Sequence, residues 1–131
     1  MPRAPERLEG LMVKEVVALA PARSVGEAVR AMVDHGIGSV VVIRGEEPVG
    51  VFTERDFLRR IVDVPDLLGR SLEAVMTAPV VTLAPEAEVF DAFEVMTAKG
   101  IRRLPVVQDG RLVGMVTERD LLRWVRDVGN E

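Results

Sequence analysis

The chain contains no cysteine and no tyrosine, and only one histidine among its 131 residues. Without cysteine it forms neither disulfides nor thiolate metal sites, and His35 alone cannot supply the ligand cluster that zinc chemistry needs. Charged residues interrupt every apolar stretch before it reaches the ~18 residues of a spanning helix. Residues 1–7 also lack the apolar region of a signal peptide. We therefore expect no metal site, no membrane span and a cytoplasmic location.

A strong basic charge is absent as well. The chain carries 17 Lys and Arg against 21 Asp and Glu, a formal net charge of −4 at pH 7. Affinity for nucleic acid comes largely from a basic face that neutralises phosphates, so nucleic acid is an unlikely partner. The sequence also lacks a paired nucleophile and base and a glycine-rich phosphate loop of the P-loop kind, so we expect no enzymatic activity.

What the chain does contain is an internal repeat. Residues 8–59 realign on residues 72–123 at a constant offset of 64, without a gap, and 22 of the 52 pairs are identical. The strongest match is residues 50–56, which return as residues 114–120 with the same Thr-Glu-Arg-Asp tetrad. Packing alone does not require a polar tetrad to return intact. The chain is therefore two copies of one supersecondary unit.

Each copy has the pattern of strand, helix, strand, strand and helix. In the first copy, Ser24 and Glu27 have the spacing of a capping box that opens a helix, and Gly36 suits the left-handed residue that ends it. In the second copy, Gly100 plays the same part and Asp109-Gly110 predicts a hairpin turn. Ser71 is expected to cap a short helical turn. The expected strands cover residues 16–19, 39–43, 49–52, 80–83, 104–107 and 112–116, and the final helix covers residues 118–127.

These elements predict an α/β (α+β) fold with two domains, residues 8–62 and 72–127, joined by a linker at residues 63–71. A small mixed sheet covered by helices on one side cannot close its own core. We therefore expect the two β-α-β-β-α repeats to pack together about a pseudo-twofold axis.

The second copy carries the residues of a known family. Met76-Thr77, residues 100–107 and the Gly-x-x-Thr-x-x-Asp signature of residues 114–120 closely resemble a cystathionine-beta-synthase (CBS) domain. Because the pattern falls in register twice, the chain from Leu8 to about Val125 resembles a tandem CBS pair, called a Bateman module. The resemblance implies no catalysis. It implies a regulatory module, for example in energy sensing, that binds AMP, ADP, ATP or S-adenosylmethionine in clefts between two CBS domains.

The resemblance also implies roles for particular residues. Thr53 and Thr117 would bond the phosphate or its neighbours, and Asp56 and Asp120 would accept hydrogen bonds from the ribose hydroxyls. Both roles suit the chemistry, because a carboxylate accepts two hydroxyl protons and a helix start favours anions. The apolar candidates for the adenine are Val17, Ile37 and Val40 in one cleft and Val81, Ile101 and Leu104 in the other. The remaining candidate ligand residues are Arg55, Arg119, Ser39, Arg102 and Arg103.

Alternatives stand beside these roles. Thr followed by Asp three residues later also suits simple helix capping, and Arg55 and Arg119 also suit a solvated face. Arg102-Arg103 replace Gly38-Ser39 of the first copy, which suggests that the second cleft binds a phosphorylated ligand more tightly, or only that two arginines face water.

The partners of the chain are also open at this stage. One possibility is a free-standing sensor that acts on an unknown effector protein, which the end of the chain at Glu131 favours. The other is a structural or dimerisation module with degenerate nucleotide sites. In either case family resemblance predicts a homodimer of CBS pairs.

Overall fold

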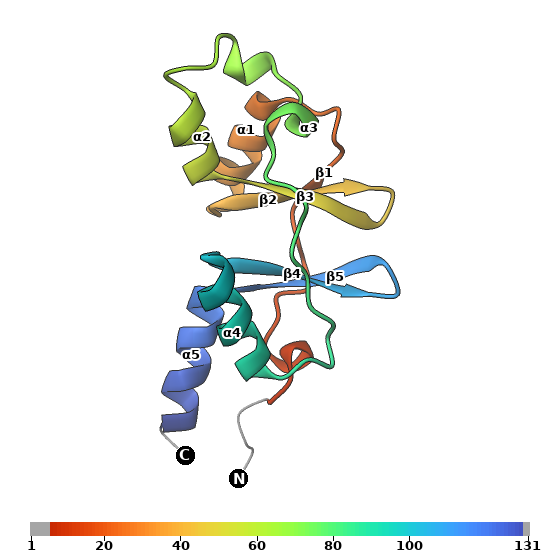
Figure 1. The fold of residues 1–131 in the computed structure, drawn as a ribbon, viewed down its shortest axis with the longest axis vertical. Coiled ribbons are helices and arrows are strands. Elements are labelled where there is room, and N and C mark those ends of the chain that lie inside the picture. The colour runs from red at the N-terminus through yellow and green to blue at the C-terminus, as the bar shows by residue number, and fades with distance from the viewer. Residues whose placement is uncertain (1–5, 130–131) are drawn as a thin grey trace. The chain divides into compact units, whose positions relative to one another are not determined.

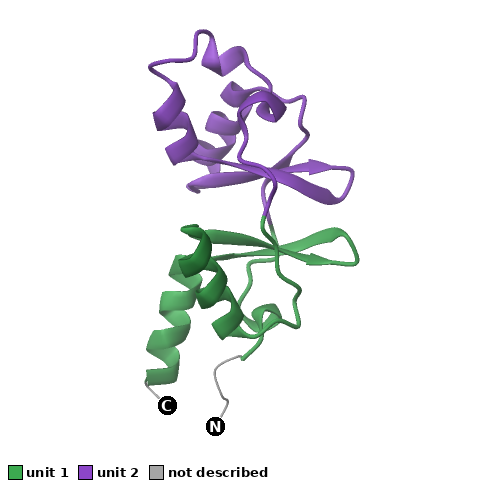
Figure 2. Cartoon of the chain, in the orientation of Figure 1, with its two compact units in different colours: residues 1–15, 81–131 green, residues 16–80 purple. Residues whose placement is uncertain are grey.

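A computed structural model describes residues 6–129 of the chain, and so excludes most of the stretch from which the lack of a signal peptide was predicted. The chain divides into two compact units (Figure 2). Unit 2 is residues 16–80, and unit 1 combines residues 1–15 with residues 81–131. The two units are therefore not the two sequence repeats. Each repeat contributes its first segment to the unit that holds the other repeat's sheet.

Unit 2 is a three-stranded sheet with helices (Figure 1). Strand β2 (Ser39–Arg44) pairs with β1 (Ala18–Leu19) in parallel and with β3 (Glu47–Thr53) antiparallel. The helices of unit 2 are α1 (Val25–His35), α2 (Glu54–Arg60) and α3 (Leu72–Val75), with a 3-10 turn, η2, at Leu67–Gly69. The hairpin and both longer helices follow the sequence prediction.

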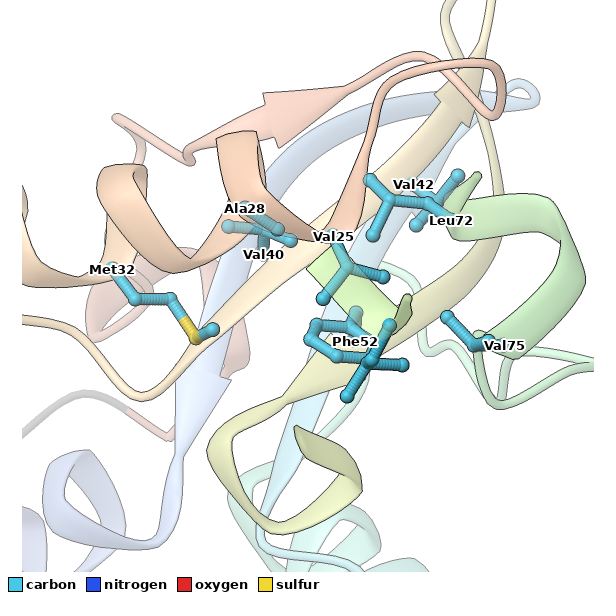
Figure 3. Close-up of a cluster of buried hydrophobic side chains, with 9 residues drawn as sticks. Val25, Ala28, Met32, Val40, Val42, Phe52, Leu72 and Val75 are labelled. Atoms are coloured by element: carbon cyan, nitrogen blue, oxygen red, sulfur yellow. The ribbon is translucent and has the colours of Figure 1, made fainter. Parts of the chain in front are cut away.

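The core of unit 2 lies between α1, α3 and the inner face of the sheet (Figure 3). Val25, Ala28 and Met32 recur at helical spacing and form the buried face of α1. The segment predicted as a linker takes part, because Leu67 is only 2% exposed and belongs to this core. The buried members of the core are Val25, Ala28, Met32, Val40, Val42, Phe52, Leu67, Leu72 and Val75.

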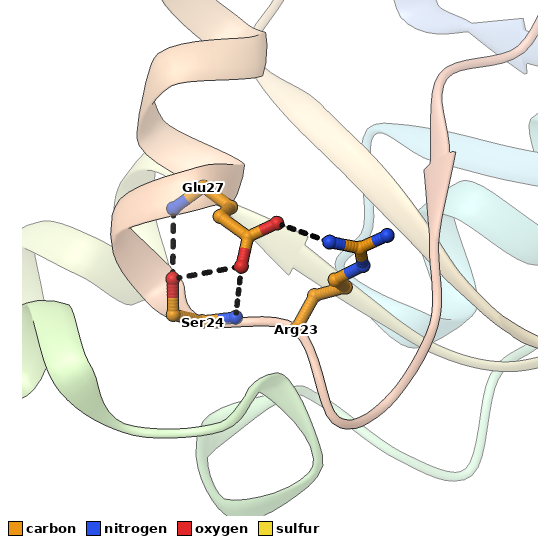
Figure 4. Close-up of polar contacts among 3 residues, drawn as sticks. All are labelled: Arg23, Ser24 and Glu27. Atoms are coloured by element: carbon orange, nitrogen blue, oxygen red, sulfur yellow. Dashed lines mark hydrogen bonds and ion pairs between the residues drawn. The ribbon is translucent and has the colours of Figure 1, made fainter.

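Helix α1 begins and ends as the sequence predicts. The Ser24 hydroxyl accepts a hydrogen bond from the Glu27 backbone N–H at 3.1 Å, and the Ser24 N–H donates to Glu27 Oε1 at 3.5 Å (Figure 4). Arg23 forms an ion pair with the same carboxylate. Gly36 ends the helix with a φ of 62°. The predicted short helix α3 forms with Ser71 as its N-cap residue, but the Ser71 side chain makes no capping hydrogen bond.

Unit 1 repeats this arrangement with a smaller sheet. Strand β4 (Arg103–Gln108) pairs antiparallel with β5 (Arg111–Thr117) through a turn in which Asp109 and Gly110 both have positive φ, as Asp-Gly predicts. The sheet packs with η1 (Leu8–Gly10), α4 (Val89–Lys99) and α5 (Glu118–Gly129). The buried core is Leu8, Val89, Ala92, Met96, Leu104, Val106, Val116 and Leu121.

The predicted strand at residues 80–83 is wrong. Only one bridge, Leu83 with Val106, forms there. Proline explains the difference: in unit 2 the Val41 N–H donates to the Val17 carbonyl at 3.1 Å, but the matching residue in unit 1 is Pro105, which has no N–H to donate. The edge strand of unit 1 is therefore reduced to a single bridge. Within residues 6–129, no helix combines the length and the apolar character that crossing a membrane requires.

Candidate functional site

Each Thr-Glu-Arg-Asp tetrad lies where a strand passes into a helix. Thr53 is the last residue of β3 and the N-cap of α2, and Thr117 is the last residue of β5 directly before α5. The Thr53 hydroxyl accepts a hydrogen bond from the Asp56 N–H at 3.1 Å, and the Thr117 hydroxyl accepts from the Asp120 N–H at 3.4 Å. The helix-capping interpretation of the tetrad is therefore confirmed in both units.

Both tetrad carboxylates are nearly buried and held in a fixed orientation. Asp56 is 9% exposed and Asp120 is 8% exposed. In each, Oδ2 accepts from the threonine backbone N–H at 2.9 Å and from the threonine hydroxyl at 3.1 Å. A carboxylate this deep needs such partners, since burying it unpaired is costly. Capping therefore uses Oδ2, and the contacts of Oδ1 decide what else each carboxylate can bind.

The contacts of Oδ1 differ between the two units. In unit 2 the Thr77 hydroxyl donates to Asp56 Oδ1 at 3.1 Å. The residue that matches Thr77 in unit 1 is Val13, which has no hydroxyl to donate. Asp120 Oδ1 instead lies 3.8 Å from Nη1 of Arg123, whose side chain is 61% exposed. The two tetrads are identical in sequence but different in their surroundings.

Glycine allows Val13 and Thr77 to lie beside the tetrads. Val13 forms a bridge with Met115 of β5, and Thr77 forms the matching bridge with Val51 of β3. A Cβ on Gly114 would lie 2.6 Å from Met12 Sδ and 3.1 Å from the Val13 carbonyl oxygen, and one on Gly50 would meet Met76 and Thr77 in the same way. The glycine of each signature is therefore needed for close approach of the crossing segment.

The structure brings the residues of the preceding strand to each tetrad. Arg103 pairs in register with Thr117, and the Glu118 N–H donates to the Arg102 carbonyl at 2.8 Å. Arg102 Nε also lies 4.0 Å from Glu118 Oε2, both side chains being more than half exposed. In unit 2 the same places hold Ser39 and Gly38, which carry no charge. The basic residues that the sequence singled out thus gather at the start of α5.

Two of the predicted adenine contacts have buried side chains. Val40 and Leu104 have no exposed surface and belong to the cores of their units, because alternation along β2 and β4 turns them toward the helices. Val17, Val81 and Ile101 are partly buried and pack against the same cores, so only part of each remains for a ligand.

Ile37, Arg55 and Arg119, by contrast, are exposed at the surface. Ile37 is 37% exposed and, with Glu54 and Phe57, lines a pocket of about 450 Å³ beside α1 in unit 2. Arg55 and Arg119 are exposed on the first turns of α2 and α5. Contact of these residues with a ligand stays a prediction.

Sequence analysis missed Thr77 and Arg123 as residues of the site. A signal for Thr77 was present, because the repeat breaks there: Val13 stands opposite Thr77 next to Met12 and Met76, which are identical. Nothing in the repeat marks Arg123, since Arg59 occupies the same place in the first copy. Only the structure reveals its contact with Asp120.

Comparison with known proteins gives a consistent result. The family model of the CBS domain matches residues 8–63 and residues 72–127. A protein of Methanopyrus kandleri, the uncharacterized protein MK0525, is 40% identical over 116 residues, which are 84% of this chain and 58% of that protein. The chain spans about half the length of the first curated relatives it matches (58% and 52%).

Solved structures share the fold over nearly the whole chain. The CBS-domain containing protein ATU1752 from Agrobacterium tumefaciens has a TM-score of 0.85 and 30% identity, with 94% of this chain and 95% of that chain covered. The CBS domain pair of protein MJ0100, crystallised in complex with 5′-methylthioadenosine and S-adenosyl-L-methionine, has a TM-score of 0.86 and 24% identity. The match covers 97% of this chain and 100% of the MJ0100 chain.

Proposed function

Because the chain belongs to the CBS domain family, we propose that it is a regulatory module that binds an adenosine-containing nucleotide and signals to a separate partner protein. The candidate ligands are AMP, ADP, ATP and S-adenosylmethionine. The observation that carries the proposal is the Asp120 carboxylate, which is fixed by its cap through Oδ2 and keeps Oδ1 for a further donor. The similar CBS pair of MJ0100 was crystallised with two adenosine compounds, which supports this ligand class.

The chemistry of the Asp120 tetrad suits a ribose and a phosphate. A carboxylate has about four acceptor positions, and two of those on Asp120 are used by Thr117. The two hydroxyls of a ribose cis-diol can use the others. The phosphate would lie at the start of α5, where the helix dipole favours anions and where Arg102, Arg103 and Arg119 supply positive charge. No catalytic step is part of this proposal.

Isothermal titration of the purified chain with AMP, ADP, ATP, S-adenosylmethionine and GTP tests the proposal. We expect saturable binding of at least one adenosine compound, with binding at least about tenfold weaker in Asp120→Ala, since a hydrogen bond to a charged group contributes about 1.5–3 kcal/mol. Asp127→Ala is the matched control, because Asp127 is an exposed aspartate of the same helix. No binding of any adenosine compound, or equal loss in both variants, would refute the proposal.

Binding to another protein is a second candidate function, and exposed apolar side chains favour it. In unit 2, Leu58 of α2 is 68% exposed and Val62, two residues after that helix, is 87% exposed, and in unit 1, Phe90 of α4 and Leu122 of α5 are 63% and 60% exposed. Solvent-exposed apolar groups that gather on helices are typical of protein interfaces. A homodimer through these helices, with or without nucleotide binding, would bury them.

Analytical ultracentrifugation at micromolar concentration tests this second candidate. A dimer that dissociates in Leu122→Glu or Leu58→Glu would support it, and the exposed Asp127→Ala again serves as the control. A monomer at every concentration up to the millimolar range would contradict it.

A further inference from the structure

A hydroxyl that contacts the carboxylate of only one tetrad belongs to Thr77. It donates to Asp56 Oδ1 at 3.1 Å, while Val13 stands at the matching place beside Asp120. We infer that Thr77 occupies the place of a ligand hydroxyl at Asp56, so that Thr77 and Val13 decide which tetrad binds the nucleotide: the Asp120 tetrad binds it and the Asp56 tetrad does not. This inference rests on the proposed function, because it names the site at which that ligand binds.

The acceptor positions of the two carboxylates support the inference. Asp56 accepts three hydrogen bonds, from the Thr53 N–H, the Thr53 hydroxyl and the Thr77 hydroxyl. Of about four acceptor positions on a carboxylate, one is left, and a cis-diol needs two. Asp120 accepts two hydrogen bonds from Thr117, and its Oδ1 lies 3.8 Å from Nη1 of the exposed Arg123 side chain. Asp120 therefore has room for both hydroxyls of a ribose.

The position of the hydroxyl is fixed by the backbone. The Thr77 N–H donates to the Val51 carbonyl at 2.9 Å and the Val51 N–H donates back at 3.0 Å. Val13 makes the same two bonds with Met115, both at 2.9 Å. Since these bridges occupy matching places in the two units, a threonine at position 13 would present its hydroxyl to Asp120 as Thr77 does to Asp56. Threonine and valine have the same shape, so exchanging them changes a donor and little else.

Two substitutions are therefore expected to change which tetrad binds the nucleotide. In Val13→Thr the new hydroxyl would donate a hydrogen bond to Asp120 Oδ1. This substitution is expected to weaken nucleotide binding by at least about tenfold, a factor that corresponds to about 1.4 kcal/mol. Thr77→Val removes the competing hydroxyl and is expected to add a second, weaker site at Asp56, because unit 2 has Gly38 and Ser39 where unit 1 has two arginines. The double variant is expected to bind one nucleotide through Asp56.

Titration calorimetry with the adenosine compound that binds tightest to the natural chain tests the inference. The natural chain should bind one ligand per chain, Val13→Thr should bind it at least about tenfold more weakly, and Thr77→Val should bind two. Ser71→Val is the control, because it also removes a hydroxyl from unit 2, and the Ser71 hydroxyl makes no capping hydrogen bond. Circular dichroism and thermal unfolding confirm that each variant is folded.

The outcomes separate this inference from the proposed function. Two equal sites in the natural chain, or unchanged binding in both Val13→Thr and Thr77→Val, would overturn the inference and leave nucleotide binding intact. No adenosine binding by the natural chain and by Thr77→Val would overturn both. Binding to Thr77→Val alone would retain the role of Thr77 as a competitor and remove Asp120 as the natural site.

Discussion

Leu8 gives the sharpest test of how the chain divides into units. It lies in the first sequence repeat but has no exposed surface in the core of unit 1, which is built around the sheet of the second repeat. Leu8→Ala removes about three methylene equivalents at about 0.8 kcal/mol each and leaves a cavity, so we expect a loss of about 2–5 kcal/mol from unit 1. Leu72, its partner at the offset of 64, has no exposed surface in unit 2 and serves as the reciprocal control.

Amide hydrogen exchange followed by NMR measures this effect strand by strand. If the free energy of unfolding of a unit falls by about 3 kcal/mol, the amide exchange rates that depend on opening of that unit rise roughly a hundredfold, since 1.4 kcal/mol corresponds to a factor of ten. We expect faster exchange in β4 and β5 for Leu8→Ala and in β2 and β3 for Leu72→Ala. If Leu8→Ala instead destabilises β2 and β3 and spares β4 and β5, the assignment of residues 1–15 to unit 1 is wrong.

Three further predictions concern local structure. Ser24→Ala should cost about 1 kcal/mol in chemical denaturation and Ser71→Ala less than about half of that, because only Ser24 makes cap hydrogen bonds; equal costs would contradict the capping argument. Pro105→Val should create a protected amide at residue 105 and lengthen the parallel edge of unit 1, and an amide there that exchanges freely would exclude proline as the cause of the missing strand. Gly114→Ala should lower stability by about 1–3 kcal/mol through contact with Met12, and an unchanged melting temperature would show that this side chain moves aside without cost.

The sequence predicted most of the fold because its signals are local. A capping box at Ser24 and Glu27, a left-handed glycine at position 36 and an Asp-Gly turn at position 109 each specify one backbone geometry, and the structure has all three. The repeat doubles one of these signals, since Gly100 ends α4 in the left-handed conformation as Gly36 ends α1.

The missing strand at residues 80–83 shows where the repeat misled. An apolar run predicts a strand in both copies, but a strand also needs donors on its neighbour. Pro105 removes one of them, and the sequence shows the proline without showing that an N–H at position 105 would have donated to the Val81 carbonyl. Which strand lies next to residues 80–83 depends on tertiary structure, and the periodicity of the sequence does not predict it.

The candidate site was predicted in part for the same reason. The tetrads carry their own capping geometry, so Thr53, Asp56, Thr117 and Asp120 come together as the spacing predicts. Thr77 reaches Asp56 from 21 residues away, through a bridge between segments that the sequence alone does not pair. The spacing did not show that the side chains of Val40 and Leu104 lie in the cores of their units, because apolar strand residues alone do not reveal which face is covered.

The most direct test of the central claim is a thermodynamic cycle on Asp120 and the ribose. The affinities of the natural chain and of Asp120→Ala are measured by titration calorimetry for the adenosine compound that binds and for its 2′-deoxy form. If Asp120 accepts the ribose hydroxyl, the deoxy ligand binds the natural chain at least about tenfold more weakly, and Asp120→Ala binds both forms equally. A penalty for the deoxy ligand of the same size in both proteins would show that the hydroxyl is bound elsewhere and would contradict the account.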